Sequence, residues 1–211
     1  MKAKLFALVI MLCAVSYVTA QNFEGKIVYE NSFKSKIPNT TDTQLAGLIG
    51  TKGEFFVKGG NYRTVMNGTW MQWSMYVNKD NKVYSKLSNL SAIQWNDGAE
   101  NTYEVVKEIL NKKVTTILGY ECDELIFETK MGTQKFYFNT NVARADSKLF
   151  EKLKFENWNA YLNRTNAFPL KIIYDAELFY YESTAREIVP MKLNDKLFEL
   201  PKDVELQKRT F

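Results

Sequence analysis

The side chains of this chain that could do chemistry are limited, because the sequence contains no histidine. Without imidazole there is no histidine-activated serine or cysteine nucleophile, no histidine-ligated zinc or copper site and no histidine pH switch. Carboxylates, lysines and tyrosines remain as acids or bases, but no close Asp/Glu spacing singles out a pair. Nucleophile-elbow, phosphate-loop and dinucleotide motifs are also missing. We therefore predict no catalytic residue, no cofactor and no metal site, and expect a protein that is not an enzyme.

The one cysteine outside the N-terminal region is Cys122, which has acidic neighbours at Glu121, Asp123 and Glu124. Negative charge nearby raises the pKa of a thiol and weakens it as a nucleophile. A redox sensor or nucleophile is the alternative reading. We predict instead that Cys122 is a buried structural residue on a strand.

Residues 1–20 have the pattern of a secretory signal peptide. Lys2 and Lys4 form a basic start, residues 5–18 are almost all apolar, and small residues precede Gln21. The apolar run spans about 21 Å as a helix, which is short of the roughly 30 Å hydrocarbon core of a membrane. We expect cleavage before Gln21 and an exported protein, periplasmic or extracellular, that is soluble after cleavage.

Two other readings of the N-terminal segment are a retained membrane anchor and a lipoprotein acylated at Cys13. The length of the apolar run disfavours the anchor. Leu12 disfavours the lipoprotein, because it precedes Cys13 where an acylation signal requires a small residue. We expect the mature protein to be peripheral to a membrane at most.

Composition and charge describe a globular protein of ordinary size. Apolar residues make up 45% of the chain and aromatic residues 14%, with only four prolines. Two of the 28 lysines and arginines lie in the signal segment, so the rest exceed the 24 acidic residues only slightly. This small excess gives no reason to expect a nucleic-acid partner. Residues 21–211 fit a single domain.

Hydrophobic periodicity predicts a chain made mostly of strands. The segment 103–110 fits both a helix and a strand, and its β-branched residues favour the strand. A short helix is expected over residues 44–49, and an interrupted helix over residues 146–163, broken near Phe155. The predicted strands cover residues 23–30, 54–58, 61–66, 69–78, 82–87, 103–110, 113–118, 121–129, 134–139, 168–175, 177–183 and 185–193.

The strand over residues 69–78 has one wholly apolar face and one mixed face. Alternate side chains of a strand point to opposite faces, so its apolar Met, Trp and Val residues share one side. We expect this side to face the interrupted helix. The simpler interpretation is that its residues fill the core, and the alternative is that they line a cavity for an apolar ligand. The candidate ligand-binding residues are Met71, Trp73, Met75 and Val77 on the strand, with Leu149, Phe150 and Leu153 on the helix.

Four short motifs in a fixed order carry a resemblance to a known family. They are Phe-Glu-Gly-Lys-Ile-Val-Tyr at 23–29, Ile-Leu-Gly-Tyr-Glu-Cys at 117–122, Phe-Pro-Leu-Lys at 168–171 and Leu-Phe-Glu-Leu-Pro at 197–201. In this order they resemble the LolA-like superfamily of periplasmic lipoprotein and lipid carriers and sensors. The nearest likeness is to exported bacterial families of unassigned function with that expected fold.

The resemblance implies an incomplete antiparallel barrel wrapped around helices, with an apolar cavity between them. It also implies that Gly119 makes a turn, that Cys122 packs inside and that the tail at 197–201 closes the sheet. It implies no catalytic residue. No arginine recognisably matches the one that holds the empty lipoprotein carriers shut, so the resemblance does not extend to lipoprotein transfer itself.

The sequence thus predicts an α+β fold: a large curved antiparallel sheet around one or two helices, in residues 21–211. The predicted function is an exported, non-enzymatic envelope protein that binds a lipid or other apolar ligand, with an envelope protein as a second potential partner. A cavity of about 300 Å³ or more would favour this reading. A filled core would favour an interaction or structural module. Two carboxyl groups about 5–10 Å apart in a cleft would favour a glycan hydrolase.

Overall fold

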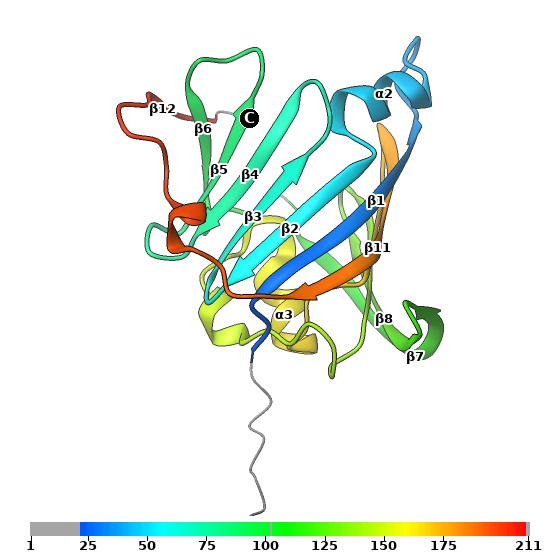
Figure 1. Cartoon of the computed structure of the whole chain (residues 1–211). Coiled ribbons are helices and arrows are strands. Elements are labelled where there is room, and N and C mark those ends of the chain that lie inside the picture. Colours follow the sequence, from blue (N-terminus) through cyan, green and yellow to red (C-terminus); the bar gives the residue numbers. More distant parts are fainter. Residues whose placement is uncertain (1–21, 102, 210–211) are drawn as a thin grey trace, which may run out of the picture.

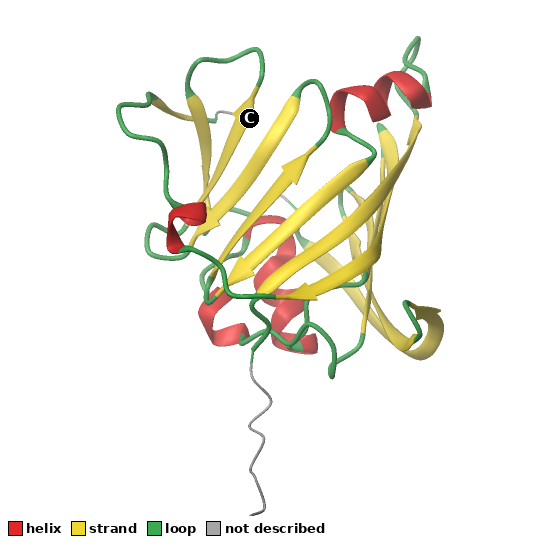
Figure 2. Ribbon diagram, in the orientation of Figure 1, coloured by secondary structure: helices red, strands yellow, loops and turns green. Residues whose placement is uncertain are grey.

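The computed structural model describes residues 22–101 and 103–209, so the expected signal peptide lies outside the described residues. Twelve strands of the described chain form one sheet, accompanied by two α-helices and three 3₁₀ helices (Figures 1 and 2). The strands are β1 (Gly25–Ser35), β2 (Lys52–Lys58), β3 (Asn61–Met66), β4 (Met71–Val77), β5 (Lys82–Leu87), β6 (Ile93–Asp97), β7 (Val105–Ile117), β8 (Tyr120–Thr129), β9 (Gly132–Phe138), β10 (Lys171–Ala176), β11 (Phe179–Pro190) and β12 (Leu206–Lys208). The helices are α2 (Asp42–Ile49), η1 (Ser147–Phe150), η2 (Phe155–Asn157), α3 (Trp158–Thr165) and η3 (Asp195–Phe198).

The sheet is open, with β12 at one edge and β7 at the other. The strand order is β12-β6-β5-β4-β3-β2-β1-β11-β10-β9-β8-β7. Neighbouring strands are antiparallel except β12, which runs parallel to β6. The sheet curls around α3, which lies on its concave side (Figure 1). This arrangement confirms the predicted fold class, a large curved antiparallel sheet that does not close into a barrel.

The turn between β7 and β8 has the geometry that the Gly119 motif predicts. Leu118 and Gly119 both have positive φ, 51° and 81°. A two-residue hairpin loop of this kind matches the twist of its strands, and glycine adopts the second position without strain. The predicted turn at Gly119 is therefore confirmed.

The interrupted helix predicted over residues 146–163 is present as η1, η2 and α3, and it continues to Thr165. The side chain of Asp146 caps its start by accepting a hydrogen bond from the backbone N–H of Lys148. The break falls at Glu156 and Asn157, whose φ values are 52° and 64°. Neither α-helix, at eight residues each, is long and apolar enough to cross a membrane, and no other described helix is either.

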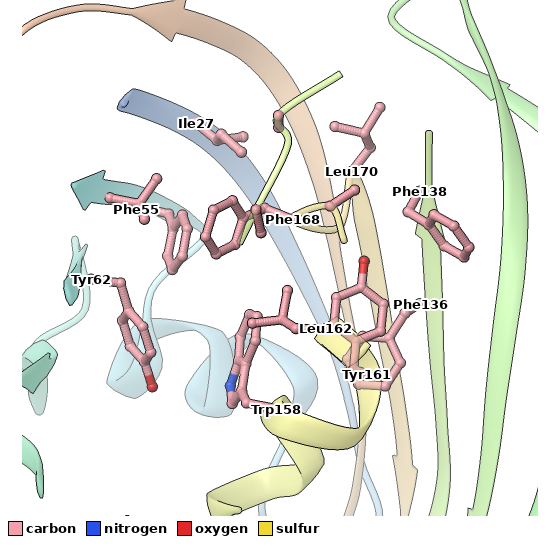
Figure 3. Close-up of a cluster of buried hydrophobic side chains, with 14 of the residues drawn as sticks. Ile27, Phe55, Tyr62, Phe136, Phe138, Trp158, Tyr161, Leu162, Phe168 and Leu170 are labelled. Carbon is pink, nitrogen blue, oxygen red and sulfur yellow. The ribbon is translucent and has the colours of Figure 1, made fainter. Parts of the chain in front are cut away.

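The main core lies between α3 and the concave face of the sheet. Tyr161 of α3 packs on Phe136 of β9, with ring centroids 4.4 Å apart, and Trp158 stacks on Phe55 at 6.2 Å. Phe168 approaches Phe55 from the loop before β10, at 5.4 Å (Figure 3). Aromatic contacts of this kind bury large areas, so α3 anchors both halves of the curved sheet.

A second core covers the convex face of β3–β6 and is built by the chain end. We call residues 191–205 the C-terminal strap. Leu193 and Phe198 of the strap are buried against Met75 of β4 and Tyr84 of β5. Arg63 binds the strap by donating a hydrogen bond from Nη1 to the Leu197 carbonyl at 3.1 Å. The tail therefore covers one face of the sheet.

The strand pattern differs from expectation in two ways. β7 and β11 each join two segments predicted as separate strands, because register shifts such as that between Asn111 and Thr115 let pairing continue past an irregularity. The segment 103–110, which also fitted a helix, lies largely in β7. β6 and β12 were not predicted. They have only five and three residues, although Ile93 and Trp95 of β6 alternate with Gln94 and Asn96.

Candidate ligand-binding cavity

A cavity of about 290 Å³ lies on the concave side, between β1–β6, β10, β11 and the start of α3. The strands provide one wall and the break before α3 provides the floor. The residues that line it are Tyr29, Asn31, Ile49, Gly53, Phe55, Tyr62, Thr64, Met66, Met71, Ser74, Val83, Ser85, Asn96, Phe155, Glu156, Trp158, Ile172, Tyr174, Tyr181, Ser183 and Arg209.

Aromatic rings form much of the wall. Tyr62 lies 5.6 Å from Trp158 between ring centroids, and Tyr174 lies 6.0 Å from Tyr181. Figure 3 shows Phe55, Tyr62 and Trp158 turned toward one another where the sheet meets α3. Such a wall is apolar but carries hydroxyl groups, a combination that suits an amphipathic ligand.

Several polar groups of the wall are fixed by hydrogen bonds within the protein. The Tyr181 hydroxyl donates to Asn31 Oδ1 at 3.2 Å, and Asn31 Nδ2 donates to the Gly50 carbonyl at 3.2 Å. The Tyr29 hydroxyl donates to the Pro169 carbonyl at 2.5 Å. These bonds hold the polar atoms in place, so this part of the wall is formed in advance.

Glu156 reaches the cavity from a strained turn that its neighbour holds. Both Glu156 and Asn157 have left-handed backbones, which cost of the order of 1–3 kcal/mol each for residues other than glycine. Asn157 is buried and donates from Nδ2 to the Tyr103 carbonyl at 2.7 Å and to Gln134 Oε1 at 2.8 Å. Its Oδ1 accepts from Asn101 Nδ2 at 2.6 Å. These three bonds stabilise the turn that points Glu156 into the cavity.

Among the described residues that line the cavity, Glu156 is the one acidic residue and Arg209 is the one basic residue. Loss of hydration raises the pKa of the Glu156 carboxyl to about 7, against a smaller opposing effect of the Arg209 charge. The Glu156 charge also contributes to raising the pKa of Tyr62, Tyr174 and Tyr181, behind the larger effect of burial. The lining thus holds one carboxyl group near its titration point among neutral tyrosines.

The predicted face of β4 is wrong for three of its four residues. Trp73, Met75 and Val77 point to the convex side, where they pack in the second core with the C-terminal strap. Ser74 lines the cavity, and Tyr76 faces η1, with its ring centroid 6.1 Å from that of Phe150.

Met71 lies on the cavity side because of a β-bulge. Met71 pairs with Leu87 and Trp73 pairs with Lys86, so Gln72 is an extra residue in β4. An extra residue reverses the alternation of side chains beyond it. The strand was read as strictly alternating, and this reading placed Met71 on the face of Trp73.

The three helix residues predicted to line a cavity lie beside it rather than in it. Phe150 and Leu153 are buried in the main core, and Leu149 packs partly buried against that core. Of the seven predicted residues, the structure brings Met71 alone to the cavity wall. Ligand binding by any of the seven stays a prediction.

Sequence reasoning missed Glu156 and the tyrosines as wall residues. The sequence shows the break in the helix near Phe155, and Glu156 and Asn157 follow it. Because asparagine tolerates a left-handed backbone, this pair was an available signal for a turn that places an acidic side chain. The alternation of side chains in the strands of Tyr62 and Tyr174 shows which residues share a face of the sheet, but not which face is concave.

Cys122 lies apart from the cavity, fully buried in the main core on β8. Burial raises the pKa of its thiol, and Asp123 adds a smaller effect in the same direction. Its Sγ donates to the Tyr120 carbonyl at 3.3 Å. The placement agrees with a structural role.

An open antiparallel sheet whose concave side holds a helix and a cavity defines this chain as an α+β protein with a preformed pocket. The chain belongs to the family described as Domain of unknown function (DUF4412), which matches residues 59–204. No curated protein matches the chain.

Solved structures that the chain matches include an uncharacterised conserved protein from Thermus thermophilus, with 8% identity and a TM-score of 0.46. The match covers 88% of this chain and 91% of that one. Another is the LolA superfamily protein NE2245 from Nitrosomonas europaea, with 9% identity and a TM-score of 0.39, covering 85% of this chain and 91% of that one.

Proposed function

We propose that the protein is an exported, non-enzymatic envelope protein that binds a lipid or other apolar ligand in the cavity between the sheet and α3. The observation that carries the proposal is the cavity itself, about 290 Å³ in volume and walled by aromatic side chains. Ligand pockets in proteins start at about 300 Å³. The volume suits one acyl chain or a small amphiphile.

The cavity argues against the two alternatives weighed from the sequence. A module with a filled sheet would leave no such space on the concave side. A carboxylate hydrolase needs two carboxyl groups across a cleft, whereas a single one, Glu156, lines this cavity. A carrier or sensor needs only a pocket that an apolar ligand can enter.

Export is part of the same proposal. We expect residues 1–20 to be removed and residues 21–211 to act as one LolA-like domain in the periplasm or outside the cell. The intact mass of protein recovered from the exported fraction should correspond to a chain that begins at Gln21. Exported protein that still carries Met1 would contradict the signal-peptide reading.

Native mass spectrometry with lipid extraction of the purified protein tests ligand binding directly. We expect an adduct or an extractable amphiphile, and uptake of a fluorescent acyl probe after it is removed. Ser74→Trp, which would fill the cavity from β4, should abolish uptake. Gln72→Trp is the matched control, because Gln72 is exposed on the same strand.

The outcomes separate a binding protein from a filled module. Probe uptake by the wild type and by Gln72→Trp, but not by Ser74→Trp, supports the proposal. Absence of any adduct together with absence of probe uptake by the wild type would contradict it. Equal uptake by both variants would indicate that the probe binds outside this cavity.

A further inference from the structure

The charge of Glu156 bears on the chemical class of ligand that the cavity would bind, and this inference rests on the proposed function. In the part of the lining that the structure describes, Glu156 contributes the one negative charge, and it lies at the floor beside Phe155 and Trp158. A carboxylate that lies in an aromatic pocket is poorly solvated. A group that completes its interactions would therefore add to binding.

The surroundings of Glu156 leave its charge under-compensated. Arg209 lies near enough to lower the carboxyl pKa, yet the loss of hydration outweighs it, so the net shift is upward to about 7. A carboxylate in a complete ion pair would have a lowered pKa. The structure thus contains a carboxyl group to which a further cation would add stabilisation.

Aromatic rings lie around the same cavity floor, and ring faces attract cations as a carboxylate does. Tyr62 of β3 and Trp158 of α3 lie 5.6 Å apart between ring centroids, and Tyr174 of β10 lies within reach of the Glu156 charge. The faces of such rings attract cations, most strongly when water is excluded. A carboxylate and electron-rich rings thus line the same cavity.

We propose that the cavity binds amphiphiles whose head group is a protonated amine or an alkylammonium, with the cation against Glu156 and the rings of Tyr62 and Trp158, and the chain along the apolar wall. Met66 and Met71 lie on that wall and offer flexible apolar contacts for a chain. Recognition is by charge and cation–π contact together.

Five groups from other parts of the described chain interact electrostatically with Glu156. They are Tyr62 on β3, Tyr103 before β7, Tyr174 on β10, Tyr181 on β11 and Arg209 after β12. The pKa of each tyrosine is raised above its ordinary value, whereas the pKa of Glu156 is about 7, so Glu156 titrates between pH 5 and 8. Preference for a cation should therefore increase as the pH rises through this range.

Three ligands with the same ten-carbon chain separate head group from chain: decylamine, 1-decanol and decanoate, titrated below their aggregation limits by isothermal calorimetry. At pH 8 we expect decylamine to bind wild-type protein about tenfold tighter than 1-decanol, with decanoate the weakest. At pH 5 the advantage of decylamine over 1-decanol should fall by several-fold, because Glu156 is protonated.

Glu156→Gln should remove the advantage of the amine at pH 8 and leave 1-decanol binding within about twofold of wild type. Glu151→Gln is the matched control, since Glu151 is an exposed residue five positions earlier that does not line the cavity. It should keep the wild-type order. The wild-type pH dependence provides the same test without any variant.

Equal binding of decylamine and 1-decanol by the wild type, or an amine preference that survives Glu156→Gln, would overturn this inference and leave the proposed function intact. Tighter binding of decanoate would overturn it as well and would point to Arg209 as the head-group residue. Failure of all three ligands to bind would contradict the proposed function itself.

Discussion

At the residue scale, the Glu156 carboxyl links the stability of the fold to pH. Its pKa rises from 4.5 in an unfolded chain to about 7 in the folded protein. A raised carboxyl pKa means that the folded state binds the proton more tightly, so its contribution is full below pH 4.5 and is lost as the pH rises to about 7. Ionised Glu156 is therefore a destabilising residue at neutral pH.

Glu156→Gln should remove the loss of stability that the ionisation of Glu156 causes as the pH rises. We expect the wild type to lose about 2–3 kcal/mol of unfolding free energy relative to the variant between pH 5 and pH 8, since one pKa unit corresponds to about 1.4 kcal/mol. Urea unfolding of both proteins at the two pH values measures the difference. Parallel stability curves for the two proteins would contradict the pKa assigned to Glu156.

Cys122 gives a second residue-scale prediction. Cys122→Ser should lower the free energy of unfolding by about 1–3 kcal/mol, because it puts a hydroxyl group into a fully buried apolar site. Probe binding should be unchanged, and a thiol reagent should label the native protein slowly at neutral pH. Rapid labelling, or loss of binding at full stability, would restore the sensor reading.

At the scale of elements, β4 shows how one inserted residue redirects a strand. The bulge at Gln72 puts Met71 on the cavity side, while Trp73 lies under the C-terminal strap. Period-two alternation was correct from residue 73 onward. The alternation alone does not show which face of β4 is concave. The apolar face lies on the convex side because the C-terminal strap buries it there.

Trp73→Ala separates the two faces by experiment. The Trp73 ring packs in the second core and lies 4.7 Å from the Arg63 guanidinium. Its removal should lower the unfolding free energy by about 2–4 kcal/mol, somewhat less than for a fully buried ring, and leave the affinity for an acyl probe unchanged. Chemical unfolding and a probe titration on one preparation measure both. A lower affinity for the probe with an unchanged unfolding free energy would contradict this placement and indicate that Trp73 contacts the ligand.

The helical segment was easier to predict than the cavity it supports. Residues 146–163 carry helical spacing, and Asp146 and the break near Phe155 are visible in the sequence. The left-handed turn at Glu156 and Asn157 depends on hydrogen bonds to Tyr103 and Gln134, which are distant in sequence. Local pattern could not reveal partners that only the folded sheet brings together.

At the scale of the whole molecule, the fold class followed from the number of alternating segments and the small number of helical ones. An antiparallel sheet of this size must bury one face, and one short helix is too small to cover it. The chain solves this with α3 on one face and the strap on the other, and the space that α3 leaves is the cavity. β12 escapes prediction because three residues carry too little periodicity, whereas the alternation of Ile93 and Trp95 with polar residues in β6 was an available signal.

Methionine methyl groups provide a direct test of where a ligand binds. Met66 and Met71 line the cavity, Met75 is buried under the C-terminal strap, and Met131 and Met191 are exposed. In a methyl-labelled NMR titration with decylamine, we predict large shifts for Met66 and Met71 and little change for the other three. Shifts confined to Met75 or to the exposed methyl groups, or no shifts at saturating ligand, would contradict a binding site on the concave side.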